Sequence, residues 1–415
     1  RFMRILFFVE PVVFRENPLF LSPHVSTWVV DTAVAHRAAG FAWALASSAP
    51  LCSLAADSAP WIKTYTIDSW HILSPFQFDR AQYARALFDP NAGLDGLAGR
   101  GDLSVLIQSL LRIRADFRPD LIIATAQNSA LAAVFADTRV LWIEQAPLPR
   151  SAGTARIAFD PAGHQVGSLL EAGIDSLFSM TMDASTLAEA EAAWTQMARP
   201  PDHHAAHAEV VRKVIRQVAG DRPVALMVLQ PSDWLTWDGA GPRGQPEAVL
   251  AHWAEQLPAG WLGIPVHHPD ARMSRAIEVS VANSFPQIAL LPESLGSGVA
   301  EFALPEVDAI ITVSSSVAMT AILAGKKVVV TGRTPYINLS SSDPSLLDGI
   351  KPCTMMERMS ILAFLTHRYT KTLEEVQNTS GSFLNYIDEI TRSQDASSWM
   401  LDRNEWIPSR ISALI

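Results

Sequence analysis

The length, composition and charge of the chain already exclude several classes of protein. Its 415 residues are enough for roughly two to three domains. Apolar residues make up 49% of the sequence and charged residues 18%, a balance that favours a packed globular core over intrinsic disorder. The net charge of −10 argues against binding to duplex nucleic acid, because that binding depends on neutralising phosphates.

The cysteines and the hydrophobic runs favour a cytoplasmic protein. The two cysteines, Cys52 and Cys353, are far apart and no C-x-x-C motif occurs, so we expect no disulfide framework and a reducing compartment. No apolar run reaches the ~18 residues expected of a membrane-spanning helix. The apolar start of the chain ends at Glu10-Pro11 without a small-residue cleavage site, and we interpret it as a buried strand.

The first half of the chain alternates β-rich apolar runs with helical patterns. Strands are expected at residues 5–9, 41–46, 121–124 and 140–143, and helices at residues 26–37, 103–117 and 129–135. Gly40 follows the first of these helices as a stop signal. Such strand–helix–strand alternation predicts a parallel sheet covered by helices on both faces.

A polar helical stretch near residues 187–220 separates this half from a second alternating unit. Strands are expected there at residues 224–229, 262–266, 288–291, 309–313 and 327–330, and helices at 246–256, 271–282 and 317–323. The fold class is therefore α/β, with two Rossmann-like, doubly wound domains facing a cleft and ligands at the carboxyl ends of the strands. We place the domains at residues 1–205 and 206–385, followed by a helical segment at residues 386–415.

The strongest candidate site is a serine-rich turn after the predicted strand at residues 309–313. Ser314, Ser315 and Ser316 follow that strand and precede a helix of small and apolar residues. Free N–H groups at a helix N-terminus, with serine hydroxyls beside them, suit a phosphate or a carboxylate. A single serine here would more simply be a helix cap, so it is the run of three that favours ligand binding.

Two histidines end another predicted strand. His267 and His268 follow residues 262–266, and Pro269 is placed to start the next helix. Imidazole beside a helix N-terminus can donate to a departing phosphate, or act as an acid or base near neutral pH. The alternative is a surface turn without function. No spaced set of carboxylates or cysteines surrounds the pair, which argues against a metal site.

Further polar residues follow strands at the same expected edge. Gln230 and Pro231 come after the first strand of the second unit, and Asp233 comes close behind, where it can act as a base or nucleophile. An aspartate in such a loop is otherwise a common turn residue, and Asp238 is a second carboxylate nearby. In the first unit, Glu144 follows a buried strand, where it is either a functional carboxylate or a solvated strand end.

Other signals are weaker. The G-x-G-x-x-G match at residues 239–244 lies in a proline-containing loop, not at a strand-to-helix turn. His203, His204 and His207 lie in the connector, and we interpret them as part of a solvated helix. No P-loop, H-E-x-x-H, G-x-S-x-G or strand-terminal D-x-D occurs, so we expect no catalytic metal.

Taken together, these segments resemble the bacterial capsule and lipopolysaccharide Kdo transferases, which have the GT-B fold and use CMP-Kdo as donor. Those enzymes carry a Q-P element, an H-P element, and a serine-rich turn followed by A-x-x-x-G-K-x-V. Here the elements read Gln230-Pro231, His268-Pro269, and the three serines followed by residues 321–328. The resemblance is specific over about residues 224–336. It is looser over the first domain, where Glu144 resembles a family glutamate. The H-P and serine elements are also similar to those of GT-B sialyltransferases.

The resemblance implies a retaining β-Kdo transferase with no cofactor besides its donor, and C-terminal helices that cross back to the first domain. In that subgroup an aspartate close after Q-P attacks the anomeric carbon, and Asp233 is the matching position. The H-P pattern selects His268 as the catalytic histidine, and Glu144 is the third catalytic candidate. The substrate- and nucleotide-binding candidates are Gln230, Pro231, His267, Pro269, Ser294, Ser314, Ser315 and Ser316.

The implied partners are a nucleotide-sugar donor and a glycan acceptor of the O-antigen or capsule-linker type. Contact with a lipid-linked glycan at the inner membrane, and membership of a longer polymerase, both stay open. Two other functions also stay open. One is an inverting GT-B transferase with another nucleotide sugar, in which Asp233 is only a base. The other is a non-catalytic polysaccharide-binding or export protein.

Overall fold

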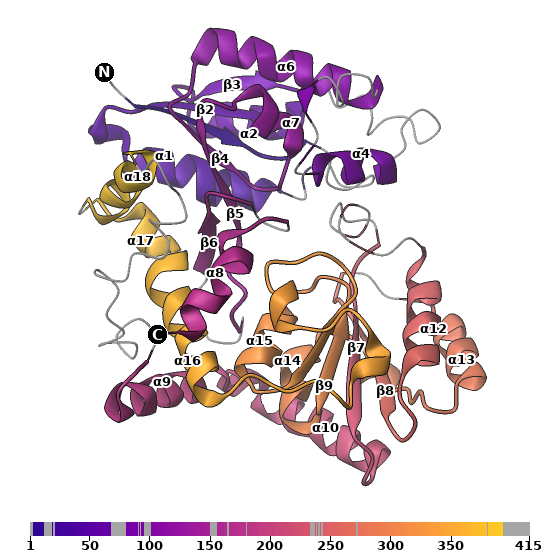
Figure 1. Cartoon of the computed structure of the whole chain (residues 1–415). Coiled ribbons are helices and arrows are strands. Elements are labelled where there is room, and N and C mark those ends of the chain that lie inside the picture. The colour runs from indigo at the N-terminus through magenta and orange to yellow at the C-terminus, as the bar shows by residue number, and fades with distance from the viewer. Residues whose placement is uncertain are drawn as a thin grey trace.

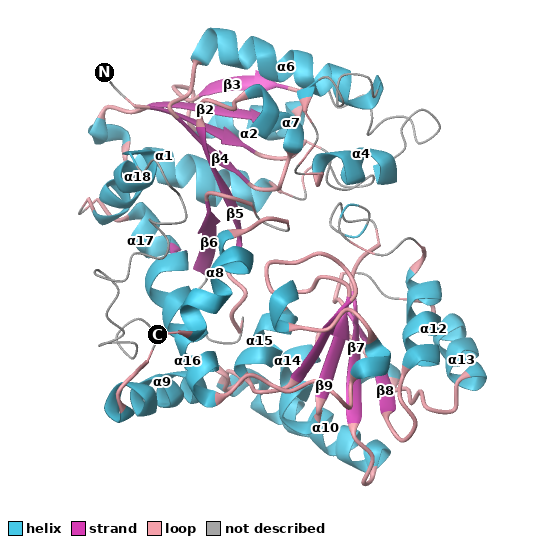
Figure 2. Ribbon diagram, in the orientation of Figure 1, coloured by secondary structure: helices cyan, strands magenta, loops and turns pink. Residues whose placement is uncertain are grey.

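The computed structural model confirms an α/β fold with two sheets, each covered by helices (Figures 1 and 2). It describes residues 3–11, 19, 21–67, 80–89, 91, 93–94, 101–149, 156–163, 166–179, 181–232, 237, 239, 241, 244–270, 273–379 and 381–392. The two sheets belong to two Rossmann-like domains, and the C-terminal helices pack on the first of them, as the GT-B expectation required.

The first sheet has the order β11-β6-β5-β4-β1-β2-β3. Its strands are β1 (Arg4–Phe8), β2 (Ala42–Ser47), β3 (Lys63–Thr66), β4 (Leu121–Ala124), β5 (Arg139–Gln145), β6 (Arg156–Asp160) and β11 (Thr370–Thr372). The pairs β3–β2, β2–β1, β1–β4 and β4–β5 are parallel, whereas β5–β6 and β6–β11 are antiparallel. The fully parallel sheet expected from the alternation is therefore extended by two antiparallel strands.

Helices cover both faces of this sheet because its strands are apolar on both sides. In β1, Ile5 and Phe7 pack into one hydrophobic cluster, and Leu6 and Phe8 pack into another. The long helices of this domain are α2 (Ala49–Ser58), α4 (Arg80–Leu87), α6 (Gly101–Phe117), α8 (Leu169–Phe178) and α9 (Ala184–Met197). The shorter helices are the π-helix η1 (His24–Asp31), α1 (Thr32–Ala35) and α7 (Ser129–Val134).

The second sheet is parallel throughout, with the order β10-β9-β7-β8. Its strands are β7 (Val224–Leu229), β8 (Leu262–His267), β9 (Ala309–Thr312) and β10 (Lys327–Val330). The accompanying helices are α10 (Asp202–Ala219), α12 (Pro246–Gln256), α13 (Arg275–Ser284), α14 (Ala300–Ala303) and α15 (Val317–Leu323).

The strand predicted at residues 288–291 is wrong. Only Ile288 bridges β8, at Gly263, where the backbone also pairs with Gln287 and Ala289. Pro286 and Pro292 flank this short stretch, and neither has an N–H group with which to extend a ladder. The segment therefore runs along the outer edge of β8 without becoming a strand.

The C-terminal segment crosses back to the first domain earlier than expected. After α16 (Met355–Phe364) and the π-helix η8 (Leu365–Tyr369), β11 joins the first sheet, and α17 (Leu373–Gln377) and α18 (Ser382–Arg392) follow (Figure 1). The expected boundary at residue 385 is therefore too late, because β11 lies before it. The boundary at residue 205 falls inside α10, a helix that packs on α14 of the second domain.

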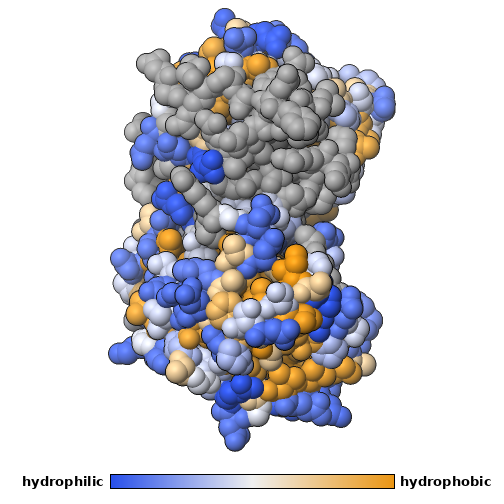
Figure 3. Space-filling model, turned by 90° about the vertical axis from the view of Figure 1, so that its right-hand side faces the viewer, coloured by the Kyte–Doolittle hydropathy of each residue, from blue (hydrophilic) through white to orange (hydrophobic). Residues whose placement is uncertain are grey.

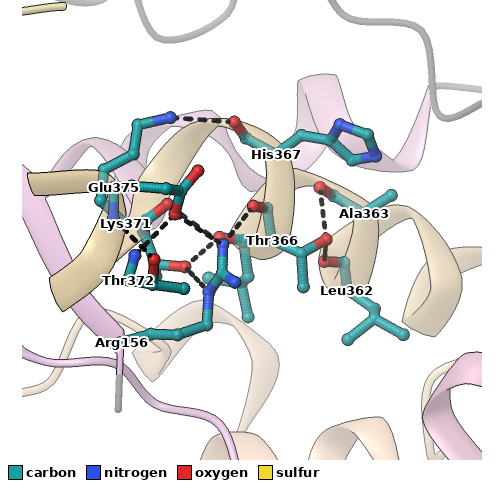
Figure 4. Close-up of polar contacts among 10 residues, drawn as sticks. Arg156, Leu362, Ala363, Thr366, His367, Lys371, Thr372 and Glu375 are labelled. Atoms are coloured by element: carbon teal, nitrogen blue, oxygen red, sulfur yellow. Dashed lines mark hydrogen bonds and ion pairs between the residues drawn. The ribbon is translucent and has the colours of Figure 1, made fainter. Parts of the chain in front are cut away.

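Arg156 on β6 fastens this returning segment (Figure 4). Its guanidinium is buried and donates to the Thr370 hydroxyl at 2.8 Å and to the Thr366 carbonyl at 2.7 Å. The Glu375 carboxylate lies 3.8 Å away. Each of these partners lies over 200 positions away from Arg156 in the chain. The contacts of Arg156 therefore hold the C-terminal segment against the first sheet.

The surface beside α12 and α13 carries hydrophobic residues. Figure 3 shows this side of the molecule, where hydrophobic residues gather on the lower, second domain. Val279 on α13 is 40% exposed, and Phe285 and Leu290 nearby are partly buried. None of the described helices combines the length and hydropathy needed to cross a membrane.

Candidate functional site

Three strand ends of the second sheet meet at its carboxyl edge. β7 lies between β8 and β9, so the residues that follow these strands are neighbours. The His268 N–H donates to the Leu229 carbonyl at 3.1 Å, and the Ser314 N–H donates to the Gln230 side chain at 2.7 Å. Gln230, His268 and Ser314, predicted from three separate motifs, therefore share one edge.

Gln230 holds the serine turn in place. Its side-chain oxygen accepts the Ser314 N–H, and its amide nitrogen lies 3.3 Å from the Ser314 hydroxyl. The orientation of this amide is assigned from its partners. Thr312, also buried, donates its hydroxyl to the Val228 carbonyl at 3.0 Å. These side chains fix the exit of β9 against the exit of β7, so Gln230 positions the turn.

The three serines have different surroundings. Ser314 is buried, whereas Ser315 and Ser316 are half-buried. The Ser315 hydroxyl accepts the Val317 N–H at 3.4 Å, which is a weak version of the helix cap proposed for a single serine. Ser316 is the N-cap residue of α15 and makes no side-chain cap. The turn thus presents the hydroxyls of Ser315 and Ser316 nearer the surface than that of Ser314.

The two histidines also differ. The His267 ring is buried, its Nε2 lies 2.5 Å from the Glu278 carboxylate, and Arg275 donates to the same carboxylate at 2.8 Å. Glu278 and Arg275 lie on α13, so His267 belongs to an ion-paired cluster that fastens α13 to β8. This position is structural, and it does not bring His267 to the serine turn.

His268 has a partly exposed ring. Its Nδ1 accepts the Asp270 N–H at 3.2 Å, and the Asp270 carboxylate lies 3.5 Å from the same nitrogen. In the tautomer in which Nδ1 accepts this hydrogen bond, the ring proton sits on Nε2. His268 can therefore present an N–H donor at the carboxyl edge.

The helix expected immediately after the histidines begins later. Pro269 is exposed and α13 starts only at Arg275, with Ser274 as its N-cap residue. The helix N-terminus predicted beside His268 is therefore absent. Ser294 is exposed in the short helix η4 (Glu293–Leu295), next to Gly296, whose carbonyl accepts a backbone hydrogen bond from the end of β8. The loop of Ser294 thus borders the same edge.

Asp233 and Asp238 lie outside the described residues, and the catalytic role of Asp233 stays a prediction. Two glycines that the structure describes, Gly239 and Gly241, lie close to other parts of the chain. A Cβ at Gly239 would lie 2.4 Å from the Phe88 ring, next to α4 of the first domain. A Cβ at Gly241 would lie 2.9 Å from a side chain at the exit of β9. Gly239 therefore lies against the first domain, and Gly241 lies against the exit of β9.

Glu144 brings a carboxylate from the first domain. It is exposed in the last part of β5, and its charge acts on two groups that sequence reasoning missed, Tyr336 and His24. Burial raises the pKa of Tyr336, and the Glu144 carboxylate raises it further. Partial removal from water lowers the pKa of His24, and Glu144 opposes that shift. Glu144 therefore lies within electrostatic reach of both.

Tyr336 contacts the serine turn. Its ring is buried and its hydroxyl donates to the Ser314 carbonyl at 3.4 Å. Two residues further on, Asn338 donates to the Glu171 carbonyl on α8 at 3.1 Å, which ties this loop to the first domain. Tyr336 follows β10, so the rule that ligand-binding residues follow parallel strands could have identified it. His24 lies in η1 and carried no comparable signal.

Among the described residues, no group of three or more histidine, cysteine, aspartate or glutamate side chains could hold a metal ion. His203, His204 and His207 are exposed on α10, in agreement with the solvated helix predicted there. Two of them contact the Phe302 ring, at centroid distances of 5.5 and 6.0 Å.

No protein-family model and no curated protein matches the chain. Among solved structures, it is similar to the KpsC β-Kdo 2,7 transferase of Thermosulfurimonas dismutans, with a TM-score of 0.40, 12% identity, and coverage of 68% of this chain and 90% of that one. It is also similar to the UDP-GlcNAc 2-epimerase of Neisseria meningitidis, with a TM-score of 0.35, 12% identity, and coverage of 94% and 100%. The corresponding values for the glycosyltransferase SnogD of Streptomyces nogalater are 0.33, 12%, 94% and 99%. At these values the likeness assigns no residue, donor or reaction to the chain.

Proposed function

We propose that the chain is a retaining GT-B glycosyltransferase that moves Kdo from CMP-β-Kdo onto a bacterial surface glycan. The observation that carries the proposal is the meeting of Gln230, His268 and Ser314 at one sheet edge. These residues come from the three motifs that resemble those of the Kdo transferases. The proposal places the enzyme in the cytoplasm, with an acceptor of the O-antigen or capsule-linker type that is lipid-linked at the inner membrane.

In this proposal the donor phosphate lies at the serine turn. The hydroxyls of Ser315 and Ser316 and the Nε2–H of His268 donate to it. When the bond between Kdo and CMP breaks, the electron pair leaves with the phosphate, and preoriented donors stabilise the charge that develops. Donors of this kind make a metal ion unnecessary, so we expect turnover to survive chelation with EDTA.

Retention of configuration requires two displacements, and therefore a nucleophile from the protein. We assign that role to Asp233, whose carboxylate attacks C2 of Kdo as CMP departs and forms a glycosyl ester. The acceptor hydroxyl then attacks the same carbon from the opposite face and the ester bond breaks. Glu144 is the candidate that takes the proton of that hydroxyl, because it belongs to the first domain and its charge acts on Tyr336, whose hydroxyl donates to the Ser314 carbonyl.

The proposal is tested by intact-mass measurement after incubation with CMP-Kdo and no acceptor. We expect one Kdo to be added to the peptide spanning residues 224–237. Asp233→Asn should form no adduct and turn over no donor, yet stay folded and bind CMP, because the amide keeps the shape and loses the nucleophilic charge. Asp238→Asn is the matched control and should still form the adduct. An adduct on Asp238, or an inverted product, would overturn the assignment.

The donor class and His268 can be tested on the same preparation. CMP should protect against thermal unfolding, whereas UDP and GDP should not, and a hundredfold excess of ligand over Kd is worth about 2.7 kcal/mol of stability. His268→Ala should lower kcat by about 10²- to 10³-fold with a smaller effect on CMP binding, since its interaction grows as the phosphate leaves. Equal protection by UDP would exclude the donor assignment. An unchanged kcat in His268→Ala would show that His268 is a turn residue without a catalytic role.

A further inference from the structure

A buried carboxylate lies beside the strand end that carries His268. The side chains of Glu278 and His267 are 3% and 2% exposed, and the Glu278 carboxylate lies 2.5 Å from the His267 Nε2. Arg275 donates to the other oxygen of this carboxylate at 2.8 Å. Glu278 and the apolar Val281 are the buried residues of α13. We call the three side chains of His267, Glu278 and Arg275 the His267 cluster.

Holding α13 against β8 does not by itself require charged groups. Removing two charges from water costs free energy that their attraction offsets only in part, and a buried ion pair is often no more stabilising than apolar side chains of similar volume. What the ion pair adds is direction, because a hydrogen bond restricts both the distance and the angle between two groups. Glu278 therefore fixes the His267 ring more closely than apolar packing would.

The His267 cluster also joins the two ends of the segment that carries His268. His267 is the last residue of β8, and Glu278 lies in the first turn of the helix that follows. His268 is the first residue of the connection between them. The backbone of His267 is bonded as well: its N–H donates to the Gly296 carbonyl at 2.8 Å, and its carbonyl accepts the Gly298 N–H at 3.0 Å.

His268 inherits its position from this strand end. Its N–H donates to the Leu229 carbonyl at 3.1 Å, and its carbonyl accepts the Ser297 hydroxyl at 3.3 Å. The two histidines share a planar peptide group, and successive side chains of an extended chain leave on opposite faces. The His267 ring, held inward by Glu278, therefore sets the rotation of the strand end and with it the direction of the His268 ring.

We propose that Glu278 is a positioning residue for His268, which it orients through His267 without touching the donor or the reacting atoms. The inference rests on the proposed function, in which His268 donates to the departing phosphate. Loss of the His267 cluster should slow the release of CMP from the donor and leave CMP binding nearly unchanged, because the interaction of His268 grows as the phosphate leaves.

The test removes the buried charges together. Glu278→Leu alone leaves His267 and Arg275 without their carboxylate and should lower stability, so the informative protein is the double variant His267→Leu/Glu278→Leu, whose apolar side chains pack in the same space. Glu278→Gln is the conservative variant, because its side-chain oxygen can still accept from His267. The control Glu209→Leu/Arg216→Leu removes an exposed ion pair on α10.

Each protein is assayed for CMP release from CMP-Kdo, for CMP affinity and for melting temperature. Since a misplacement of about 1 Å can lower a rate about a hundredfold, we expect the double variant to lose about 10- to 100-fold in kcat and to change CMP affinity by less than about threefold. Its melting temperature should stay close to that of wild type. Glu278→Gln should recover much of the lost kcat, and the control should match wild type.

The decisive comparison repeats the double variant in a His268→Ala protein. A residue that acts through His268 has nothing to position there, so the further loss in kcat should disappear. If the double variant melts well below wild type, this comparison still decides, because a general loss of structure would lower kcat in both backgrounds.

An unchanged kcat in the double variant, or an equal loss in the His268→Ala background, would overturn the inference and leave the proposed function standing. A wild-type protein that releases no CMP from CMP-Kdo would overturn the proposed function, and the inference with it.

Discussion

Replacing Gln230 separates the structural role of the serine turn from its role in binding phosphate. The Gln230 side-chain oxygen accepts the N–H of Ser314, which is buried, at 2.7 Å. Gln230→Ala leaves that N–H without an acceptor, and such an unsatisfied buried group costs about 1–3 kcal/mol. We therefore expect Gln230→Ala to lower stability, and to weaken CMP binding only as far as the turn moves.

Gln230→Glu should behave in the opposite way. A carboxylate still accepts the Ser314 N–H, so stability near neutral pH should stay close to that of wild type. The same carboxylate places a negative charge beside the proposed phosphate position. Two like charges about 5 Å apart at an effective dielectric constant of about 20 repel by about 3 kcal/mol, which is more than a hundredfold in Kd.

The measurements are melting temperature and CMP affinity by calorimetry. Gln245→Glu, at the exposed N-cap position of α12, is the charge-matched control in the same domain and should leave CMP affinity unchanged. A Gln230→Glu protein that binds CMP as tightly as wild type would show that no phosphate lies beside Ser314. A Gln230→Ala protein with unchanged stability would show that the hydrogen bond to Ser314 carries little weight.

Three further predictions concern the rest of the chain. Arg156→Leu should lower the free energy of unfolding in urea by about 3 kcal/mol or more, because it leaves several buried acceptors without a donor. The control Arg216→Leu removes only exposed ion pairs and should lower it by about 1 kcal/mol or less. Equal losses would show that Arg156 does not hold the C-terminal segment in place. Tyr336→Phe should lower kcat. The control Tyr369→Phe removes a buried phenol hydrogen bond in the first domain and should lower only stability. If both variants had the same kcat, the role of Tyr336 would be purely structural. Burial, and to a smaller extent neighbouring cations, lower the pKa of His367 in the folded protein. The unfolded chain therefore binds a proton at this histidine more readily than the folded protein does, and stability should fall as the pH falls below about 6.5. His367→Gln should flatten that slope in melting temperatures measured across pH, and an unchanged slope would contradict the reasoning.

Much of the second domain could be predicted because its signals are local. The strand of β7 and the helices α12 and α15 have the bounds that the sequence predicts. The start of α12 is marked by Pro246 at the first helical position, and β7 is a continuous apolar run typical of a buried parallel strand. The local sequence pattern therefore predicts these elements correctly, because each is apolar and has a clear signal, such as a proline, where it begins.

The elements that the sequence did not predict depend on distant partners. β11 is a polar run of three residues that becomes a strand only because it pairs with β6, more than 200 positions earlier. Its position is set by tertiary contacts such as that of Arg156, which no local pattern encodes. For the same reason, no local pattern predicts that the chain returns to the first domain as early as β11.

At the site, the strand-end rule predicts that Gln230, His268 and Ser314 share one edge, as they do in the structure, but it does not assign their partners. His267 and His268 are adjacent and look equivalent in sequence. His267 points inward because Glu278 and Arg275 on α13 hold it, and these partners are visible only in three dimensions. The alternation of β8 separates the two histidines, but it does not say which face carries a ligand.

Both backbone polar groups of Ser314, its N–H and its carbonyl, have hydrogen-bond partners within the protein, and this limits what the serine turn can offer a ligand. The Ser314 N–H is taken by Gln230, and its carbonyl is taken by Tyr336. Since the Ser314 N–H is taken by Gln230 and its carbonyl has no proton to donate, backbone donors to a phosphate at this turn have to come from Ser315, Ser316 and the residues that follow. The two clamps also differ in origin: Gln230 follows a strand of the second sheet, whereas the Tyr336 loop is tied to α8 of the first domain. In the proposed reaction, the turn beside the donor phosphate is thus connected to the domain that supplies Glu144.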